Sequence, residues 1–186
     1  MRVKLAAVLC LAILLTGCKS ANKSLEQALL LRNKLSQSNG CRFSTTVVAD
    51  YGEQVYTFAM DCQADSSGNL EFEVTSPETI AGITGKISNQ GGAITFDDKV
   101  LGFQTMADDR VTPVTAPWLF IKSLCSGYLK DCCEINDGIQ LSLDDSYNDH
   151  ALHLQVLVRN ELPVSAEIFW DGCRCLTLTV ENFTYL

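Results

Sequence analysis

Residues 41–62 read CRFSTTVVADYGEQVYTFAMDC, in which apolar residues alternate with polar ones on both sides of a short polar break. An alternation with a period of two is typical of a β-strand that buries one face. The break, Asp50-Tyr51-Gly52-Glu53, predicts a tight turn with Tyr51-Gly52 at its tip. The segment therefore predicts a β-hairpin, the basic unit of an antiparallel sheet.

The position of this turn sets the register of the two strands. With Tyr51-Gly52 at the tip, Cys41 faces Cys62 in a non-hydrogen-bonded pair. The Cα atoms of such a pair lie about 4.5 Å apart, a separation that a disulfide tolerates. We therefore predict a Cys41–Cys62 disulfide. The alternative is two free thiols packed on the buried face.

Similar alternation continues along the chain. After the hairpin, strands are expected over 70–74, 83–88, 93–96 and 100–105, and a closing antiparallel group is expected over 139–143, 151–158, 164–170 and 173–180. Asp171-Gly172 joins the last two strands and is a strong signal for a two-residue hairpin turn.

Two predicted helices interrupt the strands. Ser24 and Gln27 have the spacing of a capping box, and leucines recur at helical spacing until Asn39-Gly40 ends the helix. A second helix starts around Pro117, which suits the first turn, and is expected to end before Asp131. Strands in runs with helices in two places indicate an α+β fold, in which helices cover one face of a large sheet.

The start of the chain resembles a bacterial lipoprotein signal peptide. Arg2 and Lys4 precede the apolar run 5–15, and Leu-Thr-Gly-Cys at 15–18 stands at the expected cleavage point. The run is shorter than the roughly 20 residues that span a bilayer and fits the roughly 7–15 apolar residues of a signal. The resemblance implies cleavage before Cys18 and a stable anchor of more than one acyl chain on Cys18. The alternatives are a transmembrane anchor and a plain secretory signal.

Cleavage leaves 169 of the 186 residues, the length of one domain. Residues 1–17 are thus a predicted signal peptide, residues 18–23 a lipidated cysteine with a short polar tether, and residues 24–186 a single domain. Without Arg2 and Lys4, 12 basic residues stand against 22 acidic ones, a formal charge of about −10. An acidic body repels nucleic-acid phosphates and anionic lipid head groups, so neither is an expected partner through charge.

The remaining cysteines are candidates for disulfides, since lipidation places the domain outside the cytoplasm. Bridges are expected between two groups, with no assignable pairing: Cys125, Cys132 and Cys133 on one side, and Cys173 and Cys175 on the other. A four-sulfur zinc site is the alternative, but the spacing lacks zinc knuckles. His150 and His153, three apart on a strand, point to opposite faces, so joint metal binding is not expected. No metal or cofactor is predicted.

In its order of elements the chain resembles the lipoprotein-localisation superfamily, the LolA/LolB-like carriers and acceptors. The resemblance lies in the opening helix and hairpin over 25–62 and in Pro77-Glu78 and Ile80-Ala81-Gly82 after the third strand. It is clearest in the ending formed by 162–168, Asp171-Gly172 and 176–183. It implies a strongly curved antiparallel sheet, a half-barrel whose concave face is covered by the N-terminal and mid-chain helices. It also implies a hydrophobic cavity that shields acyl chains. The family's cavity arginine and exposed loop leucine match no position here, so the resemblance assigns no functional residue.

Inward-facing apolar side chains of the first strands and of the mid-chain helix would line such a cavity. The candidates are Phe43, Tyr56, Phe58, Met60, Phe72, Trp118 and Leu119. Ordinary core is the alternative for each of them.

Two functions follow from these observations. The first is a non-enzymatic, lipid-anchored protein of the extracytoplasmic membrane face that binds a lipid, an acyl chain or a lipoprotein. The second is a cell-envelope interaction or structural protein with a self-filled core. No G-x-S-x-G or comparable nucleophile setting is present, so no enzymatic activity is expected. The choice of membrane, the ligand and the oligomeric state stay open.

Overall fold

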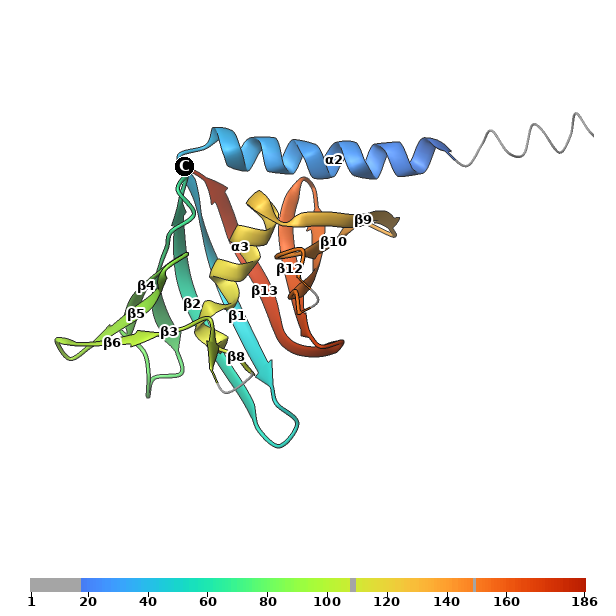
Figure 1. Ribbon diagram of the computed structural model, residues 1–186. Coiled ribbons are helices and arrows are strands. Elements are labelled where there is room, and N and C mark those ends of the chain that lie inside the picture. The colour runs from blue at the N-terminus through green and yellow to red at the C-terminus, as the bar shows by residue number, and fades with distance from the viewer. Residues whose placement is uncertain (1–17, 108–109, 149) are drawn as a thin grey trace, which may run out of the picture.

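An eleven-stranded antiparallel sheet with two helices forms the protein in a computed structural model, which describes residues 18–107, 110–148 and 150–186 (Figure 1). The helices are α2 (Cys18–Gln37) and α3 (Ala116–Ser126), the latter preceded by a 3-10 turn over Pro113–Thr115. The predicted signal peptide, residues 1–17, lies outside the described residues. In the described part, no helix combines the length and apolar character that crossing a bilayer requires.

The sheet consists of two meanders that meet in its middle. Its spatial order is β6-β5-β4-β3-β2-β1-β13-β12-β11-β10-β9. The strands are β1 (Gly40–Asp50), β2 (Val55–Asp65), β3 (Leu70–Ser76), β4 (Thr84–Ser88), β5 (Gly91–Phe96), β6 (Lys99–Phe103), β9 (Tyr128–Ile135), β10 (Gly138–Asp144), β11 (His153–Arg159), β12 (Leu162–Trp170) and β13 (Cys173–Tyr185). Two short strands, β7 (Met106–Ala107) and β8 (Arg110–Val111), pair with each other apart from this sheet.

The fold class is confirmed, but the predicted curvature is wrong. The chain is α+β, with a large antiparallel sheet and two helices, as predicted. The sheet stays open, with β6 and β9 as its edges, and it is not strongly curled into a half-barrel (Figure 1). The order of elements decides which strands are neighbours. Curl depends on bulges and on the side chains packed beneath the sheet, which a period of two does not encode.

One face of the sheet is buried and the other is largely polar. Alternate residues of β1, among them Phe43 and Val47, are buried, and Met60 of β2 and Leu178 of β13 lie on the same face. Helix α3 lies over this face, and its Phe120 is fully buried against it. Helix α2 runs along one end of the sheet (Figure 1). The apolar alternation in the sequence thus produces a single core layer between sheet and helices.

Helix α2 begins at Cys18, earlier than the predicted start at Ser24, so the predicted tether 18–23 is helical. The buried side chains Ser24, Ala28, Leu31 and Leu35 recur every three or four residues and form its inner face. The Arg32 guanidinium donates hydrogen bonds to the carbonyl oxygens of Gly127 (2.5 Å) and Ser123 (3.4 Å). These bonds link α2 to the carbonyl end of α3.

The predicted hairpin is confirmed, but its register is wrong by two residues. The tip is Gly52-Glu53, because Gly52 adopts φ +82° and Tyr51 N–H donates to Gln54 O (3.0 Å). Glycine at the first central position is the requirement of a type II′ turn. Cys41 therefore pairs with Ala64, and Cys62 pairs with Phe43. Both cysteines are free and buried, so the predicted Cys41–Cys62 disulfide is absent.

The second helix ends earlier than predicted. A Cβ at Gly127 would lie 2.5 Å from Ser123 O, so this sharp exit from α3 requires glycine. Tyr128, which lies within the predicted helix, instead starts β9. This edge strand also contains Cys132 and Cys133, which follow the predicted end of the helix and for which no strand was predicted.

Candidate functional site

The predicted cavity-lining residues lie on the helix-covered face, and most of them are packed inside it. Phe43, Met60 and Leu119 are at most 1% exposed, and Phe72 and Trp118 are also buried. Side chains this closely packed leave little room for a ligand among them.

Aromatic contacts fix the centre of this layer. The Phe43 ring stacks on Phe183 with 5.7 Å between ring centroids and meets Phe120 edge-on at 5.8 Å. Two candidates lie at its margin, since Phe58 is half-buried and Tyr56, near the hairpin tip, is 49% exposed. The structure thus brings the candidates onto one face, where they form a continuous apolar layer.

A cleft of about 320 Å³ opens beside this layer, between the ends of α2 and α3 and the turn from β2 to β3. We call it the helix–sheet cleft. Its floor is apolar and buried, and it is formed by Leu35, Cys41, Ala64 and Ile121. Its polar or exposed lining residues are Ser36, Asp65, Ser66, Ser67, Asn89, Lys122, Cys125 and Ser126. An apolar floor with a polar rim suits a ligand that has both an apolar tail and a polar head.

The rim of the helix–sheet cleft carries both signs of charge. The Asp65 carboxylate accepts hydrogen bonds from Asn69 Nδ2 (2.9 Å) and from the backbone N–H groups of Ser67 (2.8 Å) and Asn69 (3.0 Å). These bonds, with that from the Asn69 side chain the strongest, hold the pKa of Asp65 below its usual range. Lys122 Nζ lies 4.8 Å from the centroid of the Trp118 ring. Lys122 is itself a lining residue, so the rim carries a cation as well as the Asp65 carboxylate.

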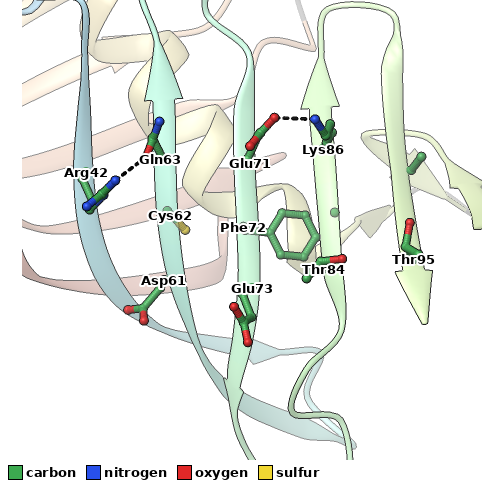
Figure 2. A pocket seen from close by; sticks show the side chains of 12 residues that line it. Arg42, Asp61, Cys62, Gln63, Glu71, Phe72, Glu73, Thr84, Lys86 and Thr95 are labelled. Atoms are coloured by element: carbon green, nitrogen blue, oxygen red, sulfur yellow. Dashed lines mark hydrogen bonds and ion pairs between the residues drawn. The ribbon is translucent and has the colours of Figure 1, made fainter. Parts of the chain in front are cut away.

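A wider groove of about 470 Å³ lies on the polar face of the sheet, across β1 to β5 (Figure 2). Two side-chain hydrogen bonds between neighbouring strands lie in this groove. Arg42 donates to Gln63 Oε1 (2.7 Å), and Lys86 Nζ donates to Glu71 Oε1 (2.5 Å). At Gly85 a Cβ would lie 2.4 Å from Cζ of Phe72, so glycine lets this ring lie under the strand. The groove is open and charged, which suits the surface of a polar partner more than an acyl chain.

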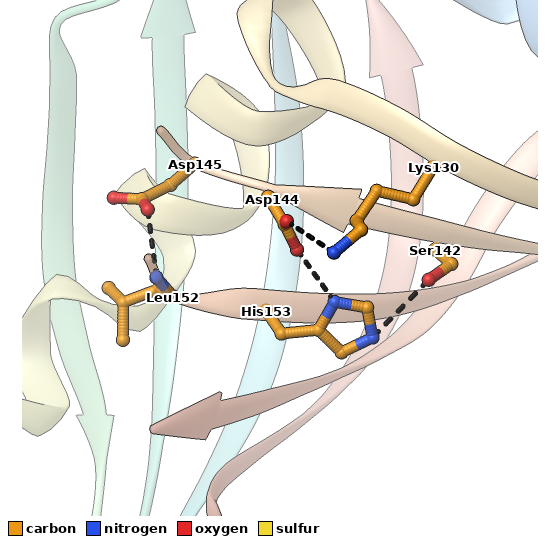
Figure 3. Close-up of polar contacts among 6 residues, drawn as sticks. All are labelled: Lys130, Ser142, Asp144, Asp145, Leu152 and His153. Atoms are coloured by element: carbon orange, nitrogen blue, oxygen red, sulfur yellow. Dashed lines mark hydrogen bonds and ion pairs between the residues drawn. The ribbon is translucent and has the colours of Figure 1, made fainter. Parts of the chain in front are cut away.

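A third group, Ser142, Asp144 and His153, has the connectivity of a hydrolase triad (Figure 3). His153 Nε2 lies 3.3 Å from Ser142 Oγ, and His153 Nδ1 lies 2.9 Å from Asp144 Oδ1. Lys130 Nζ also contacts Asp144, at 2.9 Å. Burial raises the pKa of Asp144, but hydrogen bonds and charges from His153 and Lys130 outweigh it and lower the pKa.

This group lacks the surroundings of a catalytic site. Ser142 lies within β10, paired with Asp131 on one side and Gln155 on the other. A nucleophile of this kind needs free backbone N–H donors aimed at an oxyanion. The pairing of Ser142 with β11 is regular, and the register shift between Ser142 and Leu143 lies on the β9 side. The contacts therefore tie β9, β10 and β11 together. Asp144 and His153 are not neighbours in the sequence. They meet because β10 and β11 pair and place these two residues opposite each other.

The structure shows none of the expected bridges between the later cysteines. Cys132 and Cys133 lie on β9, whereas Cys173 and Cys175 lie on β13, with three strands between them. Neighbouring strands are spaced by about 4.8 Å, which puts the two groups about 19 Å apart across the sheet. Every cysteine in the described part that follows Cys18 is a free thiol. Within the same residues, no group of three or more His, Cys, Asp or Glu side chains is arranged to hold a metal ion.

The free thiols should differ widely in reactivity. Burial raises the pKa of the Cys41 thiol to about 12, and Cys62 is still more shielded, so both should resist iodoacetamide at pH 8 in the folded protein. We expect Cys133 and Cys173, which are exposed, to be alkylated about a thousandfold faster. Peptide mass mapping after a short pulse without reductant measures this, with urea-unfolded protein as the control. A linked Cys41–Cys62 peptide, or equal labelling of all four, would contradict the expectation.

The proteins of known structure that are similar to this chain share little sequence identity with it and have TM-scores below 0.5. No family model matches the sequence, and no curated protein matches it. An uncharacterized conserved protein from Thermus thermophilus is 13% identical, with 87% of each chain covered and a TM-score of 0.47. A LolA superfamily protein from Nitrosomonas europaea is 10% identical over 89% of this chain and 93% of the other, with a TM-score of 0.45. Lipoprotein LppX from Mycobacterium tuberculosis is 10% identical over 87% and 93%, with a TM-score of 0.42.

Proposed function

We propose that this chain is a membrane-anchored, extracytoplasmic, non-enzymatic lipoprotein that binds an acyl chain, from a lipid or from another lipoprotein, in the helix–sheet cleft. One observation carries the proposal: the cleft has a buried apolar floor and a polar rim. Its volume of about 320 Å³ lies in the range of small-molecule sites, roughly 300–1,000 Å³. Lys122 on the rim supplies a cation for an acidic head group.

The proposed site differs from the cavity expected from the sequence. That cavity would lie among Phe43, Met60 and Leu119, and these side chains are packed against each other and their neighbours. The helix–sheet cleft lies beside the same layer and is lined by parts of its apolar edge, the buried Leu35 and Ile121. An acyl chain could therefore enter between α2 and α3 without displacing the aromatic centre.

The anchor is part of the same proposal. Lipidation of Cys18 would attach the acyl chains at the first residue of α2, so the domain would follow the anchor with no flexible spacer. Such an anchor holds a protein stably on a membrane because more than one hydrophobic chain is attached.

A fluorescent fatty acid titrated into the mature protein tests the cleft. We expect saturable binding to the wild type. Cys125 is exposed and lines the cleft, so the substitution Cys125→Trp should fill the cleft and weaken fatty-acid binding about tenfold or more. The matched control is Cys133→Trp, at a cysteine that is also exposed but lies on β9 outside the cleft, and this variant should bind like the wild type. Absence of saturable binding to the wild type would refute the acyl-chain proposal.

The second candidate is an envelope interaction protein whose core is filled by its own side chains. The observation that favours it is the closed layer around Phe43, combined with the charged groove on the polar face of the sheet. A wild type that retains no lipid in native mass spectrometry and binds no fatty acid would support this candidate over the first.

A further inference from the structure

Helix α2 has two apolar faces, of which the core uses only one. The inner face, with Ala28, Leu31 and Leu35, is buried against the sheet and α3. On the other side Leu25, Leu29 and Leu30 are 42%, 54% and 43% exposed. We call these three residues the outer leucine face.

Single exposed leucines are common on proteins, but three of them within two turns form a patch. They surround a shallow depression on the helix surface, which Glu26 and Asn33 complete. A surface helix normally turns polar residues outward. The outer leucine face therefore indicates a partner that covers it.

The position of α2 in the chain identifies this partner. The helix begins at Cys18, and each helical residue advances about 1.5 Å, so the outer leucine face lies about 10–18 Å along the axis from that residue. The apolar run 5–15 directly precedes it in the unprocessed chain. In Figure 1, α2 lies along one end of the molecule, and the sheet extends away from it on one side only. A membrane held at Cys18 thus has direct access to the outer side of the helix.

We propose that the outer leucine face of α2 inserts into the head-group region of a zwitterionic phospholipid bilayer, so that the helix lies along the membrane surface. Apolar contact drives this docking. The body as a whole is acidic and is repelled by anionic lipids, although α2 itself carries Lys19, Lys23, Arg32 and Lys34 against Glu26. The choline groups of phosphatidylcholine also offer a cation to Glu26, which lies among the leucines. The inference rests on the anchoring part of the proposed function and does not depend on the helix–sheet cleft.

Docking would also orient the cleft. The same helix carries the outer leucine face and, at its carboxyl end, Leu35 and Ser36 of the cleft. A helix lying on the membrane would therefore hold the cleft beside the bilayer surface, from which an acyl chain can be taken.

The test uses the mature chain acylated at Cys18 and bound to phosphatidylcholine vesicles with brominated acyl chains, which quench nearby tryptophan. We expect the emission of a tryptophan at position 29 (Leu29→Trp) to shift to the blue and to be quenched, and Leu25→Trp to behave alike. The control is Leu101→Trp at the exposed edge strand β6, which should show no added quenching over the native tryptophans.

Failures of the two proposals can be told apart. If the protein floats with the vesicles but both α2 tryptophans stay unquenched, docking is refuted while anchoring stands. If the acylated protein does not float with the vesicles, anchoring and docking both fail. Unquenched α2 tryptophans whose emission shifts with protein concentration would mean that a second copy covers the face, which also refutes bilayer docking. Loss of fatty-acid binding with normal quenching refutes only the cleft.

Discussion

Replacing Phe43 with alanine should lower the free energy of unfolding by about 3–5 kcal/mol, the cost of removing a buried aromatic side chain. Phe43 is 1% exposed and contacts the rings of both Phe120 and Phe183. Its neighbours come from α3 and β13, so the gap cannot close without moving two elements. Equilibrium urea unfolding, followed by circular dichroism, measures the change.

The size of this loss in the free energy of unfolding also shows whether Phe43 belongs to a packed core or lines a ligand cavity. The control is Phe96→Ala on β5, where the ring is 51% exposed and the cost should stay near or below about 0.5 kcal/mol. If Phe43 instead lined a ligand cavity, its removal would cost little in the empty protein. A loss below about 1 kcal/mol would therefore contradict the packed layer and favour the cavity that the sequence suggested.

Gly40→Ala should destabilise the protein by about 3 kcal/mol or more, because both the backbone and the surroundings exclude a Cβ there. Gly40 adopts φ +142°, a conformation that is nearly confined to glycine. A Cβ at this position would lie 2.0 Å from Ala64 O, which is a backbone atom of the paired strand. The strands β1 and β2 would have to separate at their ends, beside the helix–sheet cleft.

Gly52→Ala provides the matched control for this substitution. Gly52 also has a positive φ, +82°, but a Cβ there would meet no atom within 4 Å. The cost should be only the conformational one, about 1–2 kcal/mol. Urea unfolding of both variants measures the difference. Equal losses at the two positions would show that the contact with Ala64 O is relieved by a small backbone shift.

Local patterns in the sequence predicted most of the elements but not their pairing across the chain. The hairpin at 40–65 and the turn at Asp171-Gly172, where both residues have positive φ, follow from local chemistry. The exact tip of the first hairpin does not follow from local chemistry. Within residues 50–54 the tip could be Tyr51-Gly52 or Gly52-Glu53, and only the backbone conformation of Gly52 in the structure shows that it is the second. That difference of one position in the tip moved Cys41 away from Cys62.

The candidate site was less predictable than the fold. Leu35, Ile121 and Cys125 lie in the two helices that the sequence predicts, although Cys125 is exposed. No local signal places the ends of these helices next to Gly40. The outer leucine face could not be predicted either. Every leucine of an amphipathic helix is a candidate for the core until the structure shows which face of the helix is buried. Likewise, Asp144 and His153 meet only because β10 and β11 pair.

The pairing of β1 with β13 has a consequence for how the protein is made. Thr45 Oγ1 donates to Thr179 O across a separation of 134 residues, and this pair of strands joins the two halves of the sheet. Each meander can form from neighbouring segments, but the seam between them requires the last strand of the chain. Contacts of such long sequence separation slow folding, because a large loop must close before they form. A ribosome or a translocation channel that releases the chain from its amino end would thus deliver two incomplete half-sheets. The seam between the two half-sheets would form only after β13 has emerged.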